Sequence, residues 1–216
     1  LWILPEGLTV GEDIRKACHL DDKKIEIKLT PNRGDALSLI GVARDLHAIT
    51  GAPLTLPEMP DVPANSDTKI DIKIEAPDLC GRYTTRRIDN LNIHAPTPQW
   101  MKDRLERSGQ RSISALVDIS NYVMLETGIP THFSDAKKIV GGAYTVRWGK
   151  EGEKIELLNG QTVEVDSGLG VICDAQGPKV LAGIMGGEDT KVTDETTCIS
   201  IESAFWQQKA IQGRCR

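Results

Sequence analysis

Aromatic side chains are scarce in this sequence. Tryptophan, tyrosine and phenylalanine make up 4% of the 216 residues, whereas hydrophobic residues as a whole make up 39%, so the core is expected to be mostly aliphatic. No apolar run approaches membrane-spanning length and no basic, apolar leader opens the chain, so no membrane contact is expected. The chain begins at Leu1 instead of methionine, which predicts a fragment of a longer protein.

Paired cysteines and an excess of positive charge are missing too. The cysteines are odd in number and contain no Cys-x-x-Cys pair, which argues against a disulfide framework or a zinc site and favours a reducing, cytoplasmic location. They are Cys18, Cys80, Cys173, Cys198 and Cys215. A net charge of -5 argues against a free-standing nucleic-acid binder, although another part of a larger assembly could still hold nucleic acid.

The first part of the chain predicts one strand and one helix, followed by a linker. Strict alternation over residues 24–29 is typical of a half-buried strand. We expect Asp35 to cap a helix that runs from about residue 36 to residue 50, has a wide buried face and ends at Gly51. Residues 52–68 are rich in proline and acid, which predicts a linker and a domain boundary.

The middle of the chain predicts two strands and two helices. The strands are expected over residues 69–75 and 82–88. We expect Thr97 to cap a helix that reaches Gly109, and Ser112 to cap a second helix that ends at Gly128.

After residue 135 the pattern changes to short strands. They are expected at 143–148, 154–158, 161–165, 170–174, 179–183 and 196–202. Asn159-Gly160 between two apolar runs is the strongest hairpin signal in the sequence. Residues 204–216 have a helical composition. Helices first and strands afterwards predict the α+β fold class instead of an alternating α/β one.

His132 is the first candidate site residue. It lies in the segment 126–135, which we expect to be a loop held in one shape by Gly128 and Pro130. A structural hydrogen bond is the alternative role for a single histidine. The other histidines are scattered along the chain, so no metal site is expected. They are His19, His47 and His94.

Glu202 is the second candidate, because it stands in the almost wholly apolar segment 198–206. Strand alternation places it on the same face as Cys198 and Ser200, and that face is either solvated or enclosed. If it is enclosed, the carboxylate needs a partner, and a ligand hydroxyl or ammonium group would serve.

Two further pairs of residues complete the candidate pocket. Gly186 and Gly187 lie in a glycine-rich segment that can bring bare backbone NH groups to a ligand, although a simple hairpin with a bulge is the alternative. Ser120 and Asn121 interrupt the apolar pattern of the second predicted helix, and such polar residues either face solvent or are held for a purpose. Together these segments predict a small pocket.

The same segments carry the motifs of a known family. The matching motifs lie at residues 29–35, 95–101, 117–123, 128–132, 183–188 and 201–205. With these motifs in this order and spacing, the chain resembles the beta-subunit family of bacterial phenylalanyl-tRNA synthetases over nearly all of its length.

The resemblance implies a division of the chain. Residues 1–24 would be the tail of an inserted OB-type tRNA-binding module, and residues 25–67 a small preceding segment and linker. Residues 68–216 would be a C-terminally truncated B3/B4 editing domain, a three-layer α+β arrangement with an unusual β-sandwich and packed helices.

The resemblance also implies a function, the hydrolysis of tyrosine wrongly attached to tRNA(Phe), in support of phenylalanine–tRNA ligation. Glu202 would accept the tyrosine hydroxyl, helped by the backbone at Gly186 and Gly187. The residues expected to line the ester and the terminal adenosine are Ser120, Asn121 and His132. A non-catalytic docking module of the synthetase, and a β-sandwich that binds a small ligand or peptide, are the alternatives.

The implied partners are an alpha subunit in an α2β2 heterotetramer, tRNA(Phe), and tyrosine as the editing ligand. No cofactor is expected in this chain, whereas the whole enzyme would use ATP and Mg²⁺. The sequence departs from the family pattern after Pro130, where Thr131-His132-Phe133-Ser134 replaces Met-His-Ala-Phe, and at Ser120, where threonine is common. It also ends before a Thr-x-Ala segment of the family.

Overall fold

The computed structural model describes residues 3–4 and 6–214, so Cys215 and the ends of the chain lie outside the described residues. The helices are α1 (Ile14–Ala17), α2 (Leu39–Thr50), α3 (Gln99–Arg107), α4 (Ala115–Thr127) and α5 (Gln208–Ile211). The strands are β1 (Asp71–Ile74), β2 (Cys80–Asp89), β3 (His132–Asp135), β4 (Ala143–Trp148), β5 (Glu153–Glu156), β6 (Thr162–Val165), β7 (Gly170–Asp174), β8 (Gly177–Leu181), β9 (Met185–Gly186) and β10 (Cys198–Trp206).

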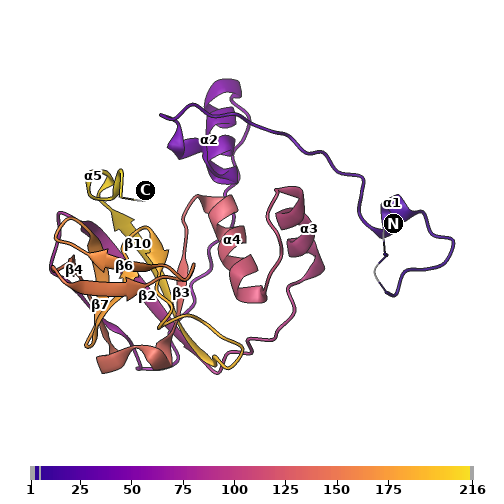
Figure 1. Ribbon diagram of the computed structural model, residues 1–216. Coiled ribbons are helices and arrows are strands. Elements are labelled where there is room, and N and C mark those ends of the chain that lie inside the picture. Colours follow the sequence, from indigo (N-terminus) through magenta and orange to yellow (C-terminus); the bar gives the residue numbers. More distant parts are fainter. Residues whose placement is uncertain (1–2, 5, 215–216) are drawn as a thin grey trace.

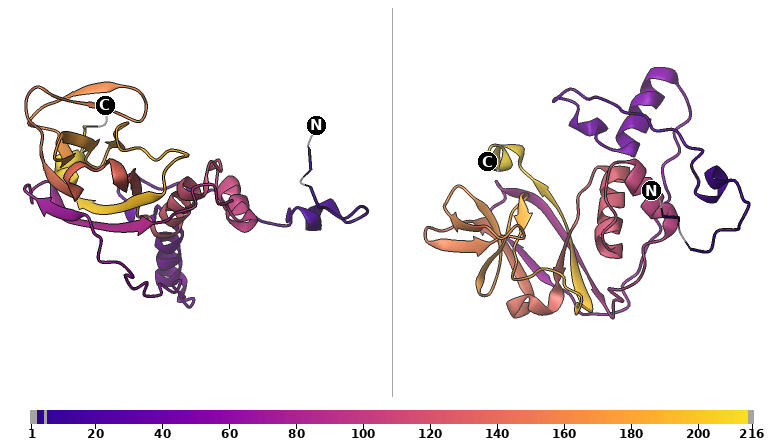
Figure 2. Two further views of the ribbon diagram at one scale, coloured as in Figure 1. Left: turned by 90° about the horizontal axis from the view of Figure 1, so that it is seen from below. Right: turned by 45° about the vertical axis from the view of Figure 1, so that its right-hand side comes forward.

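The strands form two packed sheets and a hairpin. One sheet has the order β1-β4-β7-β8-β9 and the other the order β2-β10-β3, while β5 and β6 pair as the hairpin predicted at Asn159-Gly160. Only the β1–β4 pair is parallel within the described residues. Figure 1 shows the strands on one side of the molecule, with α4 beside β3, α3 on the far side of α4 and α2 above them, and the views in Figure 2 also show the strands apart from the helices. The predicted α+β class is confirmed.

Two apolar clusters hold these layers together. The larger lies between the sheets and joins Tyr83 and Cys198 of the three-stranded sheet to Tyr144 and Val180 of the five-stranded one. The smaller lies on the other face of the five-stranded sheet, under the β5–β6 hairpin. Because neighbouring residues of a strand point to opposite faces, Ile172 joins the first cluster while Val171 and Cys173 join the second.

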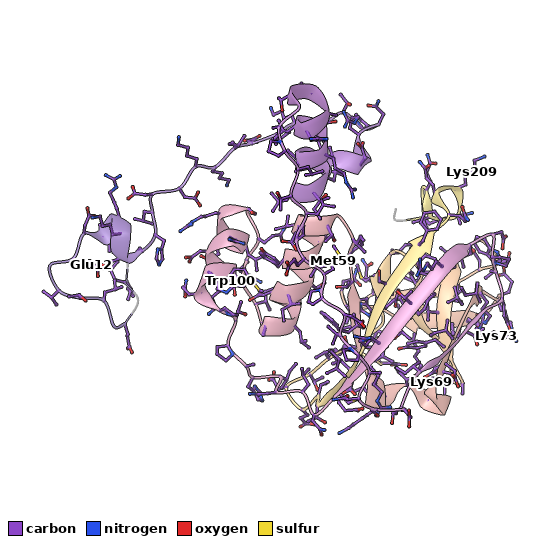
Figure 3. The ribbon with its side chains drawn as sticks, turned by 180° about the vertical axis from the view of Figure 1, so that it is seen from behind. Glu12, Met59, Lys69, Lys73, Trp100 and Lys209 are labelled. Carbon is purple, nitrogen blue, oxygen red and sulfur yellow. The ribbon has the colours of Figure 1, made fainter. Side chains whose placement is uncertain are left out.

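The helices pack against one another beside the sheets. Trp100 lies on α3, away from the sheets in Figure 3, and its ring meets the ring of Tyr122 on α4 edge-on at 5.3 Å between centroids. Arg104 of α3 donates a hydrogen bond of 2.7 Å to the Tyr122 hydroxyl. Both contacts fix α3 against α4, the helix that carries Ser120 and Asn121.

The strand predicted over residues 24–29 is wrong. No strand forms there, and Ile25 and Ile27 are exposed by 80% and 52%. Alternation marks a segment suited to pairing, but a strand also needs a neighbour, and no described segment lies alongside this one in a sheet. The extended region over 52–68 has no regular structure, as a linker would.

The predicted start and buried face of α2 are also wrong, although its end at Gly51 is confirmed by a left-handed backbone. Ser38, not Asp35, caps the helix, and its Oγ accepts a hydrogen bond from the Gly41 amide. Asp35 instead pairs with Arg33. Only Ile40 and Gly41 of the helix are buried, so its buried face is narrow.

The predicted N-caps of α3 and α4 are wrong, because the two side chains expected there make hydrogen bonds elsewhere. Pro98 and Ser114 occupy the N-cap positions, where Thr97 and Ser112 were expected. The Thr97 and Ser112 hydroxyls both donate to the fully buried carboxylate of Asp118, at 2.5 and 2.6 Å. An ionised carboxylate is a stronger acceptor than water, so it attracts both hydroxyls.

Two more boundaries differ from the prediction. The expected loop over 126–135 ends at residue 131, because residues 132–135 form β3 and pair with β10. The expected helix over 204–216 is mostly strand in its first part, since β10 runs to Trp206, and α5 covers only four residues. The last two of the predicted helical residues lie outside the described residues.

Candidate functional site

A row of polar side chains crosses the inner face of the three-stranded sheet. Glu202 of β10 is paired with Thr85 of β2 and with His132 of β3, so the three side chains point to the same side. Ser200, two residues earlier, accepts or donates a hydrogen bond of 2.7 Å with the Thr85 hydroxyl. This is the side that carries Tyr83 and Cys198 into the core between the sheets. The solvated outer face considered for Glu202 is therefore wrong, and the enclosed one is confirmed.

The Glu202 carboxyl is desolvated. Burial raises its pKa to about 7, and the nearby Tyr83 hydroxyl opposes that rise. The residue as a whole is half-buried, because its side chain borders a pocket. At neutral pH this group is thus divided between its acid and carboxylate forms, and it can accept or donate a hydrogen bond.

Glu202 faces a small cavity that we name the carboxylate pocket, with a volume of about 270 Å³. Its walls come from the β8–β9 hairpin, β10 and the segment before β3. They are Pro130, Thr131, His132, Val180, Leu181, Gly183, Ile184, Met185, Gly186, Glu202, Ala204 and Trp206. Most of these side chains are apolar, so a ligand here would meet one carboxyl in a largely apolar surrounding.

A second cavity, which we name the helix pocket, has a volume of about 550 Å³. It lies between α4, β3 and the segment after β9, and Ser120, Asn121 and Lys191 contribute polar groups to its wall. Thr131 and His132 line both cavities. The His132 imidazole therefore stands where the carboxylate pocket meets the helix pocket.

His132 is held against a glycine. A Cβ built on Gly186 would lie 2.7 Å from His132 Nε2 and closer still to Cε1, so only glycine leaves room for the imidazole. Burial lowers the pKa of His132, which keeps the ring neutral at pH 7. A neutral imidazole has one donor and one acceptor nitrogen and can orient a water or a ligand hydroxyl.

Gly187 does not take part in the way expected. Its NH donates to the Lys179 carbonyl oxygen at 2.8 Å, and the next NH, of Glu188, donates to the Glu156 carbonyl at 2.8 Å. These amides are used by β8 and β5 and are not bare. Gly186 lines the carboxylate pocket, whereas Gly187 lies outside its wall.

Ser120 connects α4 to the strand that carries His132. Its hydroxyl lies 3.0 Å from the Thr131 carbonyl oxygen and 2.9 Å from Thr131 Oγ1. These contacts hold Thr131, which departs from the family pattern, in place directly before His132. Asn121 lines the helix pocket one residue further along α4.

Sequence reasoning missed Tyr83 and Thr131. Tyr83 opposes Ala204 on β10 and lies on the same face of the sheet as Glu202, whose pKa its hydroxyl lowers, but that depends on the strand register, which the sequence does not contain. Thr131 carried a signal, since it departs from the family motif directly before the histidine.

Among the described residues, no group of three or more histidine, cysteine, aspartate or glutamate side chains is placed to hold a metal ion. The helices in the described ranges are all too short or too polar to cross a membrane.

Comparisons with known proteins give consistent results. A family model described as the B3/4 domain matches residues 79–216. Over all 216 residues, the chain is 57% identical to the phenylalanine–tRNA ligase beta subunit of Cupriavidus pinatubonensis and 58% identical to that of Ralstonia nicotianae. These matches cover 26% and 27% of the two relatives, so the chain spans about a quarter of their length.

Among solved structures, the chain is similar to the crystal structure of an N-terminal fragment of the phenylalanyl-tRNA synthetase beta subunit from Pyrococcus horikoshii. The identity is 16% and the TM-score 0.47, and the match covers 83% of this chain and 55% of that one.

Proposed function

The chain belongs to the B3/4 domain family, and from that membership and the enclosed carboxyl of Glu202 we propose that it is the editing module of a phenylalanyl-tRNA synthetase beta subunit. The proposed reaction is hydrolysis of tyrosine wrongly esterified to tRNA(Phe), in support of phenylalanine–tRNA ligation. We further propose that residues 68–216 make up this module and that residues 1–67 join it to neighbouring parts of the subunit.

The observation that carries the proposal is the position of Glu202 in the wall of a pocket whose other side chains are mostly apolar. Tyrosine is phenylalanine with one added hydroxyl, and an apolar pocket rejects an added hydroxyl by only about 10²-fold. A site built to bind that hydroxyl discriminates more strongly, because a phenylalanyl group would leave the carboxyl without its partner. The Glu202 carboxylate would accept the hydrogen bond that the phenol donates.

The reacting ester would lie on the other side of His132, in the helix pocket. The neutral imidazole would orient a water toward the ester carbonyl, while Ser120 and Asn121 border the space for the ribose and the terminal base. The water oxygen would attack the carbonyl carbon, the ester bond would break, and the ribose oxygen would leave as a hydroxyl. Orientation of the water supplies much of the rate at such a site.

The proposed assembly follows from the relatives. Their names describe ligase beta subunits, and we propose an alpha subunit in an α2β2 heterotetramer and tRNA(Phe) as partners, with a cytoplasmic location. ATP and Mg²⁺ would serve the ligation step of the whole enzyme. The alternative, a docking module without editing activity, is favoured by the exposed apolar side chains of α2, which include Leu39 and Ile49 at 65% and 76% exposure.

The proposal is tested by His132→Ala in the intact synthetase. We expect deacylation of tyrosyl-tRNA(Phe) to fall by about 10²-fold, because a water that has lost its orienting group reacts slowly. Charging of tRNA(Phe) with phenylalanine should be unchanged. The matched control is His94→Ala, at an exposed position. Equal deacylation by both variants and the parent would favour the docking alternative.

Gly186→Ala is expected to reduce mainly the deacylation rate, whereas Gly187→Ala is expected to reduce mainly the stability of the fold. A methyl group on Gly186 would displace the His132 ring and reduce deacylation, with a small change in stability, since a side chain can move. A methyl group on Gly187 would press on the Lys179 carbonyl in the next strand, and we expect a loss of about 1–3 kcal/mol.

The two glycine variants are compared by deacylation rate and by melting temperature. The opposite pattern, with Gly186→Ala unfolding the protein and Gly187→Ala inactivating it, would contradict the assignment of Gly186 to the site.

A further inference from the structure

We propose that Tyr83 is a positioning residue, whose hydroxyl donates a hydrogen bond to the Glu202 carboxylate and holds it toward the carboxylate pocket. This inference rests on the proposed function, and it assigns to a residue of β2 behind the pocket wall an effect on the ligand that is exerted only through Glu202. Tyr83 itself does not line either cavity.

The strand register brings the two side chains together. Tyr83 is paired with Ala204, two residues from Glu202, and it lies on the same face of the sheet. Side chains related in this diagonal way lie about 7–8 Å apart at the backbone, which an aromatic side chain can span. Thr85, directly opposite Glu202, has its hydroxyl bonded to Ser200 instead.

The Tyr83 hydroxyl is a buried donor in need of an acceptor. In the described part of the chain it has no partner that meets hydrogen-bond geometry, and a buried, unpaired hydroxyl is unfavourable. Among charged groups the Glu202 carboxyl has the largest effect on the pKa of Tyr83, and the Tyr83 hydroxyl in turn lowers the pKa of Glu202. Burial, together with Glu202, raises the pKa of Tyr83, so its hydroxyl keeps the proton that it would donate.

The ring of Tyr83 is fixed in place. It is 9% exposed and meets the ring of Trp206 edge-on, with centroids 6.4 Å apart and an interplanar angle of 77°. Trp206 itself lines the carboxylate pocket. A fixed phenol on one side leaves the second carboxylate oxygen free for the phenol of a ligand on the other side.

The titratable groups around Glu202 leave Tyr83 as its main donor. His132 faces it from β3, Cys80 and Tyr83 from β2, and Tyr144 from β4, whereas β8 and β9 present apolar or glycine residues. Burial lowers the pKa of His132 and raises that of Cys80, which keeps both neutral. Burial raises the pKa of Tyr144, whereas Ser134 and Thr190 lower it. The Glu202 charge adds to the rise, but only the Tyr83 hydroxyl lowers the pKa of Glu202 in return.

Tyr144 offers a matched control. It is also a buried tyrosine of the inter-sheet core, and its hydroxyl also lacks a partner of good geometry among the described residues. Tyr83→Phe and Tyr144→Phe each remove one such hydroxyl and keep the ring. A difference between the two variants therefore comes from the interaction of Tyr83 with Glu202 and not from the loss of a buried hydroxyl as such.

The first measurement follows protonation of Glu202 in the intact synthetase without substrate. Infrared difference spectra are recorded across pH, and the carboxyl band that Glu202→Gln removes is followed. We expect its midpoint near pH 7 in the parent, about one pH unit higher in Tyr83→Phe, and unchanged in Tyr144→Phe. An unchanged midpoint in Tyr83→Phe would overturn the proposal.

The second measurement is deacylation of tyrosyl-tRNA(Phe) at pH 7. Tyr83→Phe should raise KM about fivefold with a smaller change in kcat, because fewer molecules carry an ionised Glu202 and the loss is in binding. Tyr144→Phe should match the parent. A shifted infrared midpoint with unchanged KM would support the contact between Tyr83 and Glu202 but contradict the proposed function of the pocket.

Discussion

Glu202→Gln is expected to raise the free energy of unfolding by about 3 kcal/mol at pH 8, and by nearly nothing at pH 4.5. The folded chain holds the Glu202 proton up to a pKa of about 7, whereas the reference value for glutamate is 4.5. Between these two values the folded state binds more protons than the unfolded state, so stability falls as pH rises through this window. A difference of about 2.5 pH units corresponds to about 3 kcal/mol.

Glutamine has nearly the same shape and no charge to desolvate, so the variant avoids this cost at every pH. The measurement is denaturant unfolding of the 216-residue chain at pH 4.5 and at pH 8, with Glu164→Gln as the control at a side chain that is 79% exposed. The control should stay within about 0.5 kcal/mol of the parent. A gain for Glu202→Gln that is the same at both pH values would show that desolvation of the carboxylate is not its cause.

The same substitution should weaken the proposed editing reaction. A hydrogen bond to a charged acceptor contributes about 1.5–3 kcal/mol, so kcat/KM for tyrosyl-tRNA(Phe) should fall by about 10- to 100-fold. Hydrolysis of phenylalanyl-tRNA(Phe) should not fall, because that substrate has no hydroxyl to bind. A parallel loss for both substrates would point to general damage of the pocket.

Asp118→Ala is expected to cost at least about 3 kcal/mol of stability. The carboxylate is fully buried and accepts hydrogen bonds from Thr97, Ser112 and the Ile113 amide, at 2.5, 2.6 and 2.9 Å. Removal of the acceptor leaves three donors unpaired, and each unpaired group costs about 1–3 kcal/mol where water cannot reach it. Thr97→Val, which removes one donor only, is the matched control and should cost about 1 kcal/mol.

The pH dependence of the Asp118 contribution has the opposite sign to that of Glu202. Burial alone would raise the pKa of Asp118, but the hydrogen bonds from Ser112, Thr97 and Ile113 outweigh it and lower the pKa. The contribution is therefore present above the usual aspartate range and is lost as the pH falls through the lowered value. Unfolding measured at pH 7 and at pH 3 should show the gap between Asp118→Ala and the parent narrowing in acid. A gap independent of pH would contradict an ionised Asp118.

The strands of the second half were predictable because each signal is local. The elements at 143–148 and 170–174 match β4 and β7 to the residue, and Asn159-Gly160 marks a hairpin whose second residue has a positive φ of 80°. Local signals failed where a distant partner decides the outcome. Residues 24–29 alternate but have no neighbouring strand, and Thr97 and Ser112 turn from their expected caps to Asp118.

The candidate site was also predictable only in part, because some of its residues depend on distant parts of the chain. Glu202, His132 and Gly186 come together as the family resemblance implies, because β9, β10 and β3 meet at one pocket. Gly187 and Tyr83 depend on facts that only the fold contains. The amide of Gly187 is used by the adjacent strand, and Tyr83 shares a face with Glu202 through the register of β2 against β10.

The enclosed position of Glu202 has a consequence for inheritance. Since the charged form of Glu202 destabilises the fold, a mutation to a neutral residue of similar shape would give a more stable protein that still folds. Selection removes most harmful mutations because they destabilise the protein and cause misfolding, but it would not remove this mutation for that reason. Under the proposed editing function, selection on the accuracy of translation would keep a glutamate at this position, and lineages that tolerate tyrosine in place of phenylalanine should lose it readily.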